Sequence, residues 1–598
     1  MKQYVMGNGA IALGALSSGI GLIAGYPGTP SSEIIETVSK AEHDGVHVEW
    51  SVNEKAAMEV AAAASYSGAR CMVTMKQVGL NVASDPLMSL AYVGVKGGMI
   101  VVSADDPGPI SSQTEQDSRR FAEFARVPVF DPSSPEEAFD MVGAAYELSE
   151  KYHTPVFLRP TTRICHAYAS IDVPEEYHKK EYEGFVKDSK KWVIFPRLSF
   201  ENHAMIEKRN AVISREFSDT PFNTCEGASS KAVVTGGVSY AYAKEFLKDD
   251  PDIKIIKVGT PFPFPDDFVL KALEGTDEVI CFEELSPFLE ENILRLAGKH
   301  HLDIKVSGKL DGLVPSSGEL SANAAEKILG AFFDIAPEST EEAKDVLPLP
   351  VRPPVLCAGC PHRASFYAVK QAMKGKKAVF CGDIGCYTLG NAAPLDMVDT
   401  CLCMGAGVNI TQGIGRIEPD TNCFAFVGDS TFFASAITGV INAVYNQADM
   451  TLVVLDNSTT AMTGHQPHPG TGRTMMGQVV DKVSIEAVLR GIGVKTVETV
   501  DPLKLDAAVD CVKRVSAEKG VKAIIFKSPC AVLIKGKAPA VIDSGKCINC
   551  KKCINSLGCP GLVIKDGKAA IEASLCTGCG LCSQVCPVNA IGGGENAE

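Results

Sequence analysis

Two runs of cysteines near the C-terminal end carry the clearest chemical signal in the sequence. Eight of the 21 cysteines lie in residues 541–598, in CINCKKCINSLGCP and CTGCGLCSQVCP. Three closely spaced thiolates converge on one cubane, and in two-cluster ferredoxins the more distant fourth cysteine ligates the other cluster. The pattern therefore predicts two [4Fe–4S] clusters, one on Cys547, Cys550, Cys553 and Cys586 and the other on Cys576, Cys579, Cys582 and Cys559.

Zinc is the alternative metal for such cysteines, but zinc sites use two pairs of ligands and not triplets closed by Cys-Pro. The first run is longer than the common pattern, because five residues separate Cys553 from Cys559. That change enlarges a loop without removing a ligand. A pair of clusters forms a relay for single electrons, so we expect an electron donor and a soluble electron acceptor.

A second group of polar residues follows two apolar segments that are expected to be parallel strands. Gly428-Asp429-Ser430 ends one strand and opens a helix, and Asp456-Asn457 ends the next strand. Ligands bind α/β folds at the carboxyl ends of parallel strands. Carboxylate and amide oxygens placed there suit Mg²⁺ bridging a diphosphate. The alternative is two ordinary strand–turn junctions.

A glycine-rich turn at 403–415, CMGAGVNITQGIG, precedes this pair and enters a helix. The free N–H groups around Gly405 and Gly407 suit a diphosphate oxygen. A competing glycine cluster at 7–9 can be read as a dinucleotide-binding fingerprint. No convincing long strand precedes that cluster, which argues against the dinucleotide reading.

The segments that must position these residues predict a multidomain α/β fold. Within 1–175, strand-like runs alternate with helical runs, a pattern typical of a doubly wound parallel sheet. Further α/β units are expected at 231–345 and 346–540, with a proline-rich boundary between them. Residues 176–230 are charged and irregular and are interpreted as a connector. Residues 541–598 have little apolar core and are expected to form a small α+β ferredoxin-like domain around their clusters.

Composition excludes several classes of protein. Hydrophobic residues make up 45% and charged residues 22%, which is typical of a globular chain. The net charge of −15 and the lack of a basic run argue against nucleic-acid and anionic-membrane partners. A membrane span is the alternative for the apolar segment 7–28, but Gly, Ala and Ser dominate it. We therefore expect a soluble, cytoplasmic protein whose grouped cysteines bind metal clusters and do not form disulfides.

Further motifs, taken with those above, resemble the 2-oxoacid:ferredoxin oxidoreductase family. AGYPGTPSSE is similar to the family's Y-P-x-T-P-S-S signature, and CAGCPHR and DIGCYTLG follow in the family's order. The strand-end pair resembles the thiamine diphosphate signature, GDG and then NN, with Ser430 for the second glycine and Asp456 for the first asparagine. The resemblance extends over essentially the whole chain and is to alpha subunits of the indolepyruvate type.

The resemblance implies an activity, cofactors and partners. Such enzymes decarboxylate arylpyruvates oxidatively with coenzyme A, giving aryl-acetyl-CoA and CO₂, and pass electrons through iron–sulfur clusters to ferredoxin. Thiamine diphosphate carries the carbanion chemistry. By the resemblance, 1–175 binds the pyrimidine, 231–345 is transketolase C-terminal-like, and 346–540 binds the diphosphate and Mg²⁺. A smaller gamma-type beta subunit, in an α2β2 assembly, is implied as the partner.

The resemblance also assigns roles to individual residues. Glu54 is implied as the acid that protonates the thiamine pyrimidine, a role that needs a raised pKa. Thr29 is implied to lie near the substrate, and His465 and His468 are expected to flank the mouth at the thiazolium ring of the cofactor. The implied ligands of Mg²⁺ are the Asp429 carboxylate, the Asn457 side chain and the Thr459 carbonyl.

Each of these roles has a plainer structural alternative. A carboxylate at the position of Glu54 also suits a helix start through the macrodipole, and Glu49 and Glu59 are the fallback candidates for the activating acid. Thr29 also suits a helix N-cap. Loop histidines such as His465 are more often solvated than catalytic.

A third, proximal cluster is implied by four scattered cysteines, Cys357, Cys360, Cys386 and Cys530. It would give electrons from the thiamine site an acceptor nearby. The alternative is that these cysteines are small buried hydrophobes, as free cysteines often are. We favour that alternative for Cys71, Cys165, Cys281 and Cys423.

Other functions are open at this level. The chain could be a 2-oxoacid:ferredoxin oxidoreductase with a different substrate range, since the sequence does not fix the preferred 2-oxo acid. A nonoxidative thiamine decarboxylase would have no use for a two-cluster tail. An electron-carrier subunit with an inactive thiamine core is the alternative outside the enzymes, and the presence of Asp429, Asn457 and Glu54 argues against it.

Overall fold

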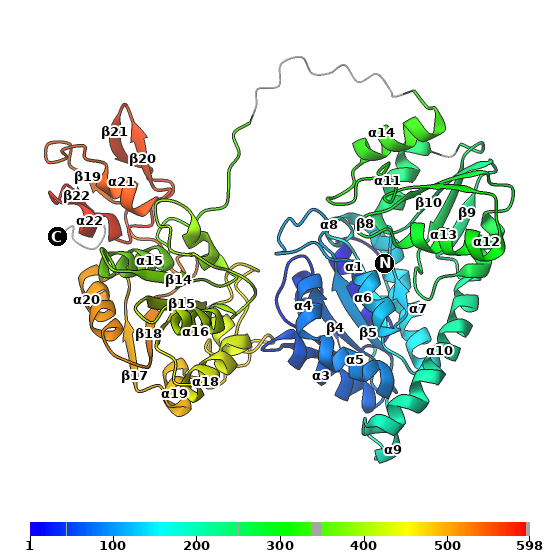
Figure 1. The fold of residues 1–598 in the computed structure, drawn as a ribbon, viewed down its shortest axis with the longest axis horizontal. Coiled ribbons are helices and arrows are strands. Elements are labelled where there is room, and N and C mark those ends of the chain that lie inside the picture. Colours follow the sequence, from blue (N-terminus) through cyan, green and yellow to red (C-terminus); the bar gives the residue numbers. More distant parts are fainter. Residues whose placement is uncertain (44, 249, 337–348, 594–598) are drawn as a thin grey trace. The chain divides into compact units, whose positions relative to one another are not determined.

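The structure is a computed structural model that describes residues 1–43, 45–248, 250–336 and 349–593. It divides into two compact units, Met1–Asp345 and Val346–Glu598 (Figure 1). The boundary expected at 345/346 lies outside the described residues. In the described part of the chain, no helix is both long enough and apolar enough to cross a bilayer. The apolar segment 7–28 instead holds the helix α1 (Gly7–Ser17) and a strand.

The first sheet of the N-terminal unit is parallel throughout, as the alternating pattern predicts. Its strand order is β3-β2-β4-β5-β7-β6. The strands are β2 (Leu22–Gly25), β3 (His47–Trp50), β4 (Cys71–Lys76), β5 (Met99–Ala104), β6 (Val129–Phe130) and β7 (Val156–Leu158). The helices α3 (Glu54–Tyr66) and α7 (Pro135–Tyr152) pack against it. Strands β4 and β5 are buried almost throughout, as a sheet covered on both faces requires.

The second sheet of this unit has the order β13-β12-β10-β11-β9 and is parallel except for its edge strand β9. Its strands are β9 (Asn223–Glu226), β10 (Lys231–Thr235), β11 (Lys254–Val258), β12 (Glu278–Phe282) and β13 (Lys305–Ser307). The charged segment before it is not irregular, because α10 (Pro196–Phe217) occupies much of it. Ile206, Ile213 and Phe217 form a narrow buried stripe at helical spacing, which the many charged neighbours conceal in the sequence.

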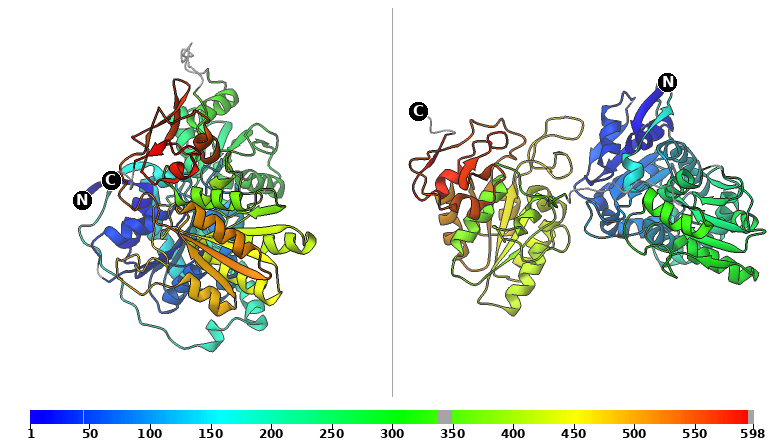
Figure 2. Two further views of the ribbon diagram at one scale, coloured as in Figure 1. Left: turned by 90° about the vertical axis from the view of Figure 1, so that its left-hand side faces the viewer. Right: turned by 90° about the horizontal axis from the view of Figure 1, so that it is seen from above.

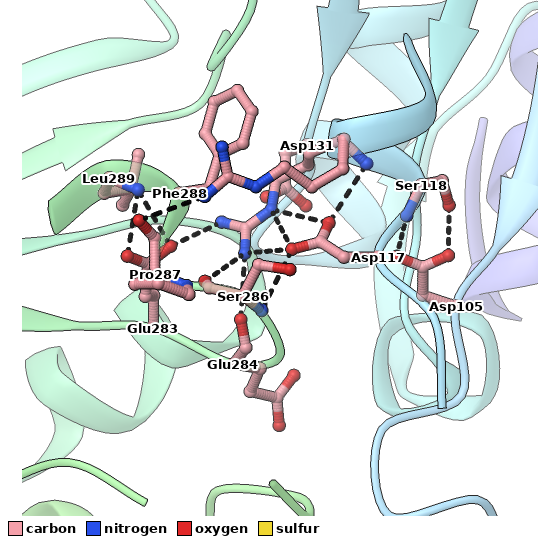
Figure 3. Close-up of polar contacts among 12 residues, drawn as sticks. Asp105, Asp117, Ser118, Asp131, Glu283, Glu284, Ser286, Pro287, Phe288 and Leu289 are labelled. Carbon is pink, nitrogen blue, oxygen red and sulfur yellow. Dashed lines mark hydrogen bonds and ion pairs between the residues drawn. The ribbon is translucent and has the colours of Figure 1, made fainter. Parts of the chain in front are cut away.

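A buried network of charges joins the two sheets of the N-terminal unit (Figure 3). Arg119, on α6 (Ser118–Ala125), is 2% exposed. Its guanidinium donates to Glu283 Oε2 at 2.8 Å, beyond β12, and to Asp117 Oδ2 at 2.8 Å. Beside it, Arg159 Nε donates to Asp105 Oδ2 at 2.7 Å. Each buried charge in this network thus has an opposite charge as its partner, which it needs in a medium that does not solvate ions.

The C-terminal unit is built on a third parallel sheet, of order β14-β15-β16-β18-β17. Its strands are β14 (Ala378–Cys381), β15 (Asn422–Gly428), β16 (Met450–Asp456), β17 (Thr496–Val500) and β18 (Val521–Lys527). The helices α16 (Gly407–Ile417) and α20 (Leu505–Ser516) pack against this sheet, and α15 (Pro361–Ala372) packs against α20. Asp429 follows β15 and Asn457 follows β16, so both lie at the carboxyl edge of adjacent strands.

The tail after residue 540 has two short helices, α21 (Lys552–Leu557) and α22 (Leu581–Val585), and two antiparallel strand pairs. The pairs are β19 (Val541–Ile542) with β22 (Ile591–Gly592), and β20 (Leu562–Lys565) with β21 (Lys568–Ile571). Its few apolar side chains, including Leu557 and Val585, share one buried cluster with Phe366 of α15. The tail is therefore packed onto the third sheet domain (Figure 2) and does not depend on its own interior alone.

The buried network predicts a large effect of replacing Arg119. Arg119→Met should leave Asp117 and Glu283 buried without a cation and destabilise the N-terminal unit by about 3–5 kcal/mol. Hydrogen exchange of the β5 and β12 amides would measure this as a lower free energy of opening. Arg120→Met is the matched control, because Arg120 pairs with Glu291 near the surface and should cost at most about 1 kcal/mol. Equal effects of the two substitutions would contradict the role given to the network.

Candidate active site

The two halves of the predicted metal site are hydrogen-bonded to each other in the C-terminal unit. Asp429 is buried. Its Oδ1 accepts from the N–H of Ser430 at 2.8 Å, and its Oδ2 accepts from the N–H of Ser458 at 2.7 Å. Asn457 directly precedes Ser458, and its Oδ1 accepts from the N–H of Thr459 at 3.3 Å. The structure thus brings Asp429, Asn457 and Thr459 to one edge of the sheet, as the spacing predicts.

Two buried histidines complete this edge. His468 Nε2 lies 3.1 Å from Asp429 Oδ2, and His362 Nε2 lies 3.2 Å from Asn457 Nδ2. Burial lowers the pKa of His362 to about 4, against the charge of Asp429, which raises it. His362 is therefore neutral at ordinary pH. It lies in the CAGCPHR motif, 95 positions before Asn457, and no local pattern in the sequence predicts the contact between them.

The glycine-rich turn before α16 is held by a buried carboxylate. Asp383 Oδ1 accepts from the N–H of Gly405 at 2.7 Å, while Asp383 Oδ2 has no hydrogen-bond partner among the described residues. Burial raises the pKa of Asp383 to about 6, and its backbone hydrogen bonds lower it in part. A Cβ at Gly405 would lie 2.3 Å from Ser435 Oγ, and one at Gly407 would lie 2.6 Å from the carbonyl oxygen of Gly382. Close packing therefore requires glycine at both positions.

The donor set at this edge fits a divalent cation on a diphosphate. It offers the hard oxygens of Asp429 and Asn457 beside the glycine turn. Asp456, the residue that departs from the signature, turns to the N–H of Ser458, which lies 3.1 Å from its Oδ1. His465 lies near this edge: its N–H donates to the carbonyl of Thr460 at 3.0 Å, and its Nε2 lies 3.9 Å from Cys530 Sγ. His468, and not His465, is the histidine that contacts the metal-site carboxylate.

In the N-terminal unit, the loop around Thr29 is fixed by Asn8. The amide of Asn8 donates to the carbonyl of Pro30 at 2.6 Å and to Glu33 Oε2 at 2.9 Å. The helix that follows, α2 (Ser32–Lys40), begins after Ser31, so Thr29 is not its N-cap. The glycine cluster at 7–9 is also explained by packing, since a Cβ at Gly7 would lie 1.9 Å from the carbonyl oxygen of Ile164.

Glu54 is the first residue of α3, which is capped by the side chain of Asn53. Glu54 is half-buried, and burial raises its pKa, while its own backbone N–H and Lys76 lower it. A Cβ at Gly79 would lie 2.5 Å from Glu54 Oε1, so that glycine makes room for the carboxyl group. The raised pKa is what an acid that must hold a proton needs.

The fallback acids are engaged elsewhere. Glu49 Oε1 accepts from Ser51 Oγ at 2.7 Å, and Glu49 Oε2 lies 2.8 Å from His47 Nε2. Glu59 pairs with Lys55 one helical turn away on the surface. Their partners favour Glu54 among the three carboxylates.

Lys76, at the end of β4, is a residue of this region that the sequence pattern does not mark. Its stem lies against the loop, because a Cβ at Gly28 would be 3.2 Å from Lys76 Cγ, and its ammonium donates to the carbonyl of Ser111 at 3.3 Å. Burial lowers the pKa of Lys76, and Asp106 and Glu54 raise it. A cation therefore lies between the predicted activating acid and the loop that contains Thr29.

The tail places its eight cysteines around two small cavities. One cavity is lined by Cys559, Cys576, Cys579 and Cys582, and the other by Cys547, Cys550, Cys553 and Cys586. These are the same two sets that the cysteine spacing predicts. Burial and the neighbouring thiols raise the pKa of Cys582 to about 12. Among the described residues, no three His, Cys, Asp or Glu side chains lie close enough together to hold a single metal ion.

The four scattered cysteines lie in the C-terminal unit, and their thiols affect one another's pKa. Burial raises the pKa of Cys386 to about 11, with the thiols of Cys530 and Cys357 adding to the effect. Burial raises the pKa of Cys360 to about 12, and Cys386 adds to that effect. By contrast, the cysteines expected to be small buried hydrophobes are buried in sheet or helix interiors: Cys71, Cys165, Cys281 and Cys423.

Three family models match three separate segments of the chain. Residues 13–219 match "Pyruvate flavodoxin/ferredoxin oxidoreductase, thiamine diP-bdg". Residues 383–526 match the "Thiamine pyrophosphate enzyme, C-terminal TPP binding domain", and residues 540–592 match a "4Fe-4S dicluster domain". The α/β architecture, the thiamine diphosphate-binding domains and the C-terminal dicluster domain expected from the sequence are therefore confirmed.

Curated relatives match over nearly the full length. The indolepyruvate oxidoreductase subunit IorA of Methanothermobacter thermautotrophicus is 40% identical over 99% of this chain and 97% of its own length. The subunits of the same name from Archaeoglobus fulgidus and Pyrococcus horikoshii are 40% and 39% identical, over 99% and 98% of this chain and 97% and 96% of their own lengths. The chain therefore belongs to the family of indolepyruvate oxidoreductase IorA subunits, within the thiamine diphosphate-dependent 2-oxoacid:ferredoxin oxidoreductases.

Proposed function

We propose that this chain decarboxylates arylpyruvates, indole-3-pyruvate among them, oxidatively with coenzyme A, and passes the electrons to ferredoxin. The products are then an aryl-acetyl-CoA and CO₂. The observation that supports the proposal is the presence, in one compact unit, of the Asp429–Asn457 edge and two cavities that the tail cysteines line. The names of the relatives support the aromatic class of substrate.

Thiamine diphosphate, when bound, supplies the carbanion chemistry. Asp429, Asn457 and the Thr459 carbonyl would hold Mg²⁺ on its diphosphate. The glycine turn, with Gly405 and Gly407, would donate N–H groups to the diphosphate oxygens, together with the Gly428–Ser430 corner. His362, which is neutral, would orient the amide of Asn457 without competing for the metal through a positive charge.

Glu54 would hold a proton on its carboxyl group and donate it to the pyrimidine ring of the cofactor. Its raised pKa keeps that proton in place at a higher pH than an exposed glutamate would. Lys76 supplies a cation beside the Thr29 loop, which suits the carboxylate that every 2-oxo acid carries. Thr29 and His465 are each proposed to act near the substrate.

The thiol groups would carry the electrons. We propose [4Fe–4S] clusters on both cavity-lining sets of the tail and a proximal cluster on Cys357, Cys360, Cys386 and Cys530. Single-electron transfer through them to ferredoxin requires no proton at the cysteines. We also propose a cytoplasmic α2β2 assembly with a smaller gamma-type subunit, with 1–175 binding the pyrimidine and 346–540 the diphosphate.

A different substrate range within the same family is the second candidate, because Lys76 would serve any 2-oxo acid. Anaerobic kinetics of the chain with its partner subunit should separate the two. We expect kcat/KM for indolepyruvate, phenylpyruvate and hydroxyphenylpyruvate to exceed that for pyruvate and 2-oxoglutarate by about 10-fold or more. The reverse order would replace the arylpyruvate assignment.

Replacing Glu54 should separate cofactor binding from cofactor activation. Glu54→Gln keeps the shape but has no acidic proton, so thiamine diphosphate should still bind while exchange of its C2 proton slows by about 10²–10⁴-fold. Exchange into deuterated buffer, followed by NMR, measures this rate. Glu59→Gln is the control, since Glu59 pairs with Lys55 on the surface. Exchange at the unmodified rate in Glu54→Gln would show that another group protonates the pyrimidine.

Iron content should report the proximal cluster. With all three sets loaded, anaerobically purified chain should hold about twelve irons, and Cys386→Ser should hold about four fewer. The tail must stay in place for this count, because Leu557 and Val585 share the core of the sheet domain. Cys423→Ala, a buried cysteine outside the three sets, is the control. Unchanged iron in Cys386→Ser would remove Cys386 from the ligands.

A further inference from the structure

Arg363, on the first turn of α15, is a buried cation without a carboxylate partner. It is 4% exposed, and its guanidinium donates to two backbone carbonyls, those of Leu356 and Leu557. Its Nε has no hydrogen-bond partner among the described residues. Among the described residues, Arg363 forms no ion pair with Asp or Glu. An unpaired buried charge is costly, so this side chain needs an anion that carboxylates do not provide.

The groups that surround Arg363 are thiols. The side chain lines the tail cavity that Cys559, Cys576, Cys579 and Cys582 share. Burial lowers the pKa of Arg363, and the thiols of Cys559, Cys360, Cys579 and Cys357 act in the opposite direction, in that order. The charge of Arg363 thus interacts with thiols of both sets: Cys559 and Cys579 of the tail, and Cys357 and Cys360 of the proximal set.

The loops that carry these two sets touch at a glycine. Gly359, between Cys357 and Cys360, has φ +75°, and a Cβ there would lie 2.0 Å from Oγ1 of Thr577. Thr577 lies between Cys576 and Cys579 of the tail. The tight contact leaves no space between the two cysteine loops, and Arg363 follows directly after one of them.

Neutral thiols would leave the guanidinium uncompensated, whereas a [4Fe–4S] cluster with thiolate ligands carries a net negative charge. We propose that Arg363 is the counter-ion of the cluster held by Cys559, Cys576, Cys579 and Cys582, and that it raises the reduction potential of that cluster. The inference rests on the proposed iron–sulfur ligands. When the cluster takes up one electron, it gains one negative charge and no bond breaks. A fixed cation nearby stabilises the reduced form more than the oxidised form.

Among the described residues that line the other tail cavity, none is a buried arginine or lysine. Lys551 lines it, but that side chain is only half-buried, and water screens its charge more strongly. The two tail clusters therefore differ in reduction potential because the cations near them differ, although each has four cysteine ligands. The cluster beside the proximal cysteines is the one that Arg363 makes easier to reduce, so it is the acceptor for electrons that leave the proximal set.

Redox titration of the full-length chain, followed by electron paramagnetic resonance, tests the proposal. Arg363→Gln keeps hydrogen-bond donors for the two carbonyls but removes the charge. The midpoint potential of the cluster on Cys559, Cys576, Cys579 and Cys582 should therefore shift to more negative values, by more than any other midpoint. Arg363→Lys keeps the charge and should shift it less. Lys370→Met is the matched control on the same helix, because Lys370 also donates to two backbone carbonyls, of Pro394 and Leu395, but does not line the cysteine cavity.

Iron content separates the possible failures. A chain without iron in the tail would refute the proposed ligands, whereas full iron with unchanged midpoints in Arg363→Gln would refute only the role of Arg363. An equal shift in Lys370→Met, or a shift in Arg363→Lys as large as in Arg363→Gln, would show that Arg363 only anchors the tail. If Arg363→Gln fails to fold, Arg363→Lys decides alone, because a large shift with the charge kept contradicts the proposal.

Discussion

The hydrogen bond from the backbone of Ser458 to the carboxylate of Asp429 is the contact on which the candidate site depends. It joins the ends of β15 and β16, so two motifs that lie apart in the sequence share one corner. Asn457, His362 and His468 take their positions from that corner. Parallel pairing makes the corner possible, because both strands end at the same edge and turn there toward the same ligand.

Ionisable side chains that are buried away from water are accommodated in two different ways. In the N-terminal unit, some buried ions pair with one another, as Arg119 does with Asp117 and Glu283. The functional edges instead keep carboxyl groups whose ionised form is disfavoured, since burial raises the pKa of both Glu54 and Asp383. Such groups are expected where a ligand completes the structure.

Local spacing explains what the sequence could predict. The tail cysteines lie within short runs, so their division into two sets follows from chain geometry, and the alternating strands and helices indicate the parallel sheets. His362, Asp383, Lys76 and Arg363 could not be found in this way, because each acts through neighbours that only tertiary packing supplies. The helix α10 was missed for a related reason, since its buried stripe is narrow among charged residues. The T-P-S-S-E pattern also suits a helix N-cap at Thr29, and only the structure shows that Ser31 takes this position.

We infer that this chain couples decarboxylation to single-electron transfer. The product balance of the chain with its partner subunit, indolepyruvate, coenzyme A and ferredoxin under anaerobic conditions tests this coupling. We expect about two reduced one-electron ferredoxins and one acyl-CoA for each CO₂ released. Release of CO₂ with the aldehyde as product, while ferredoxin stays oxidised, would contradict it.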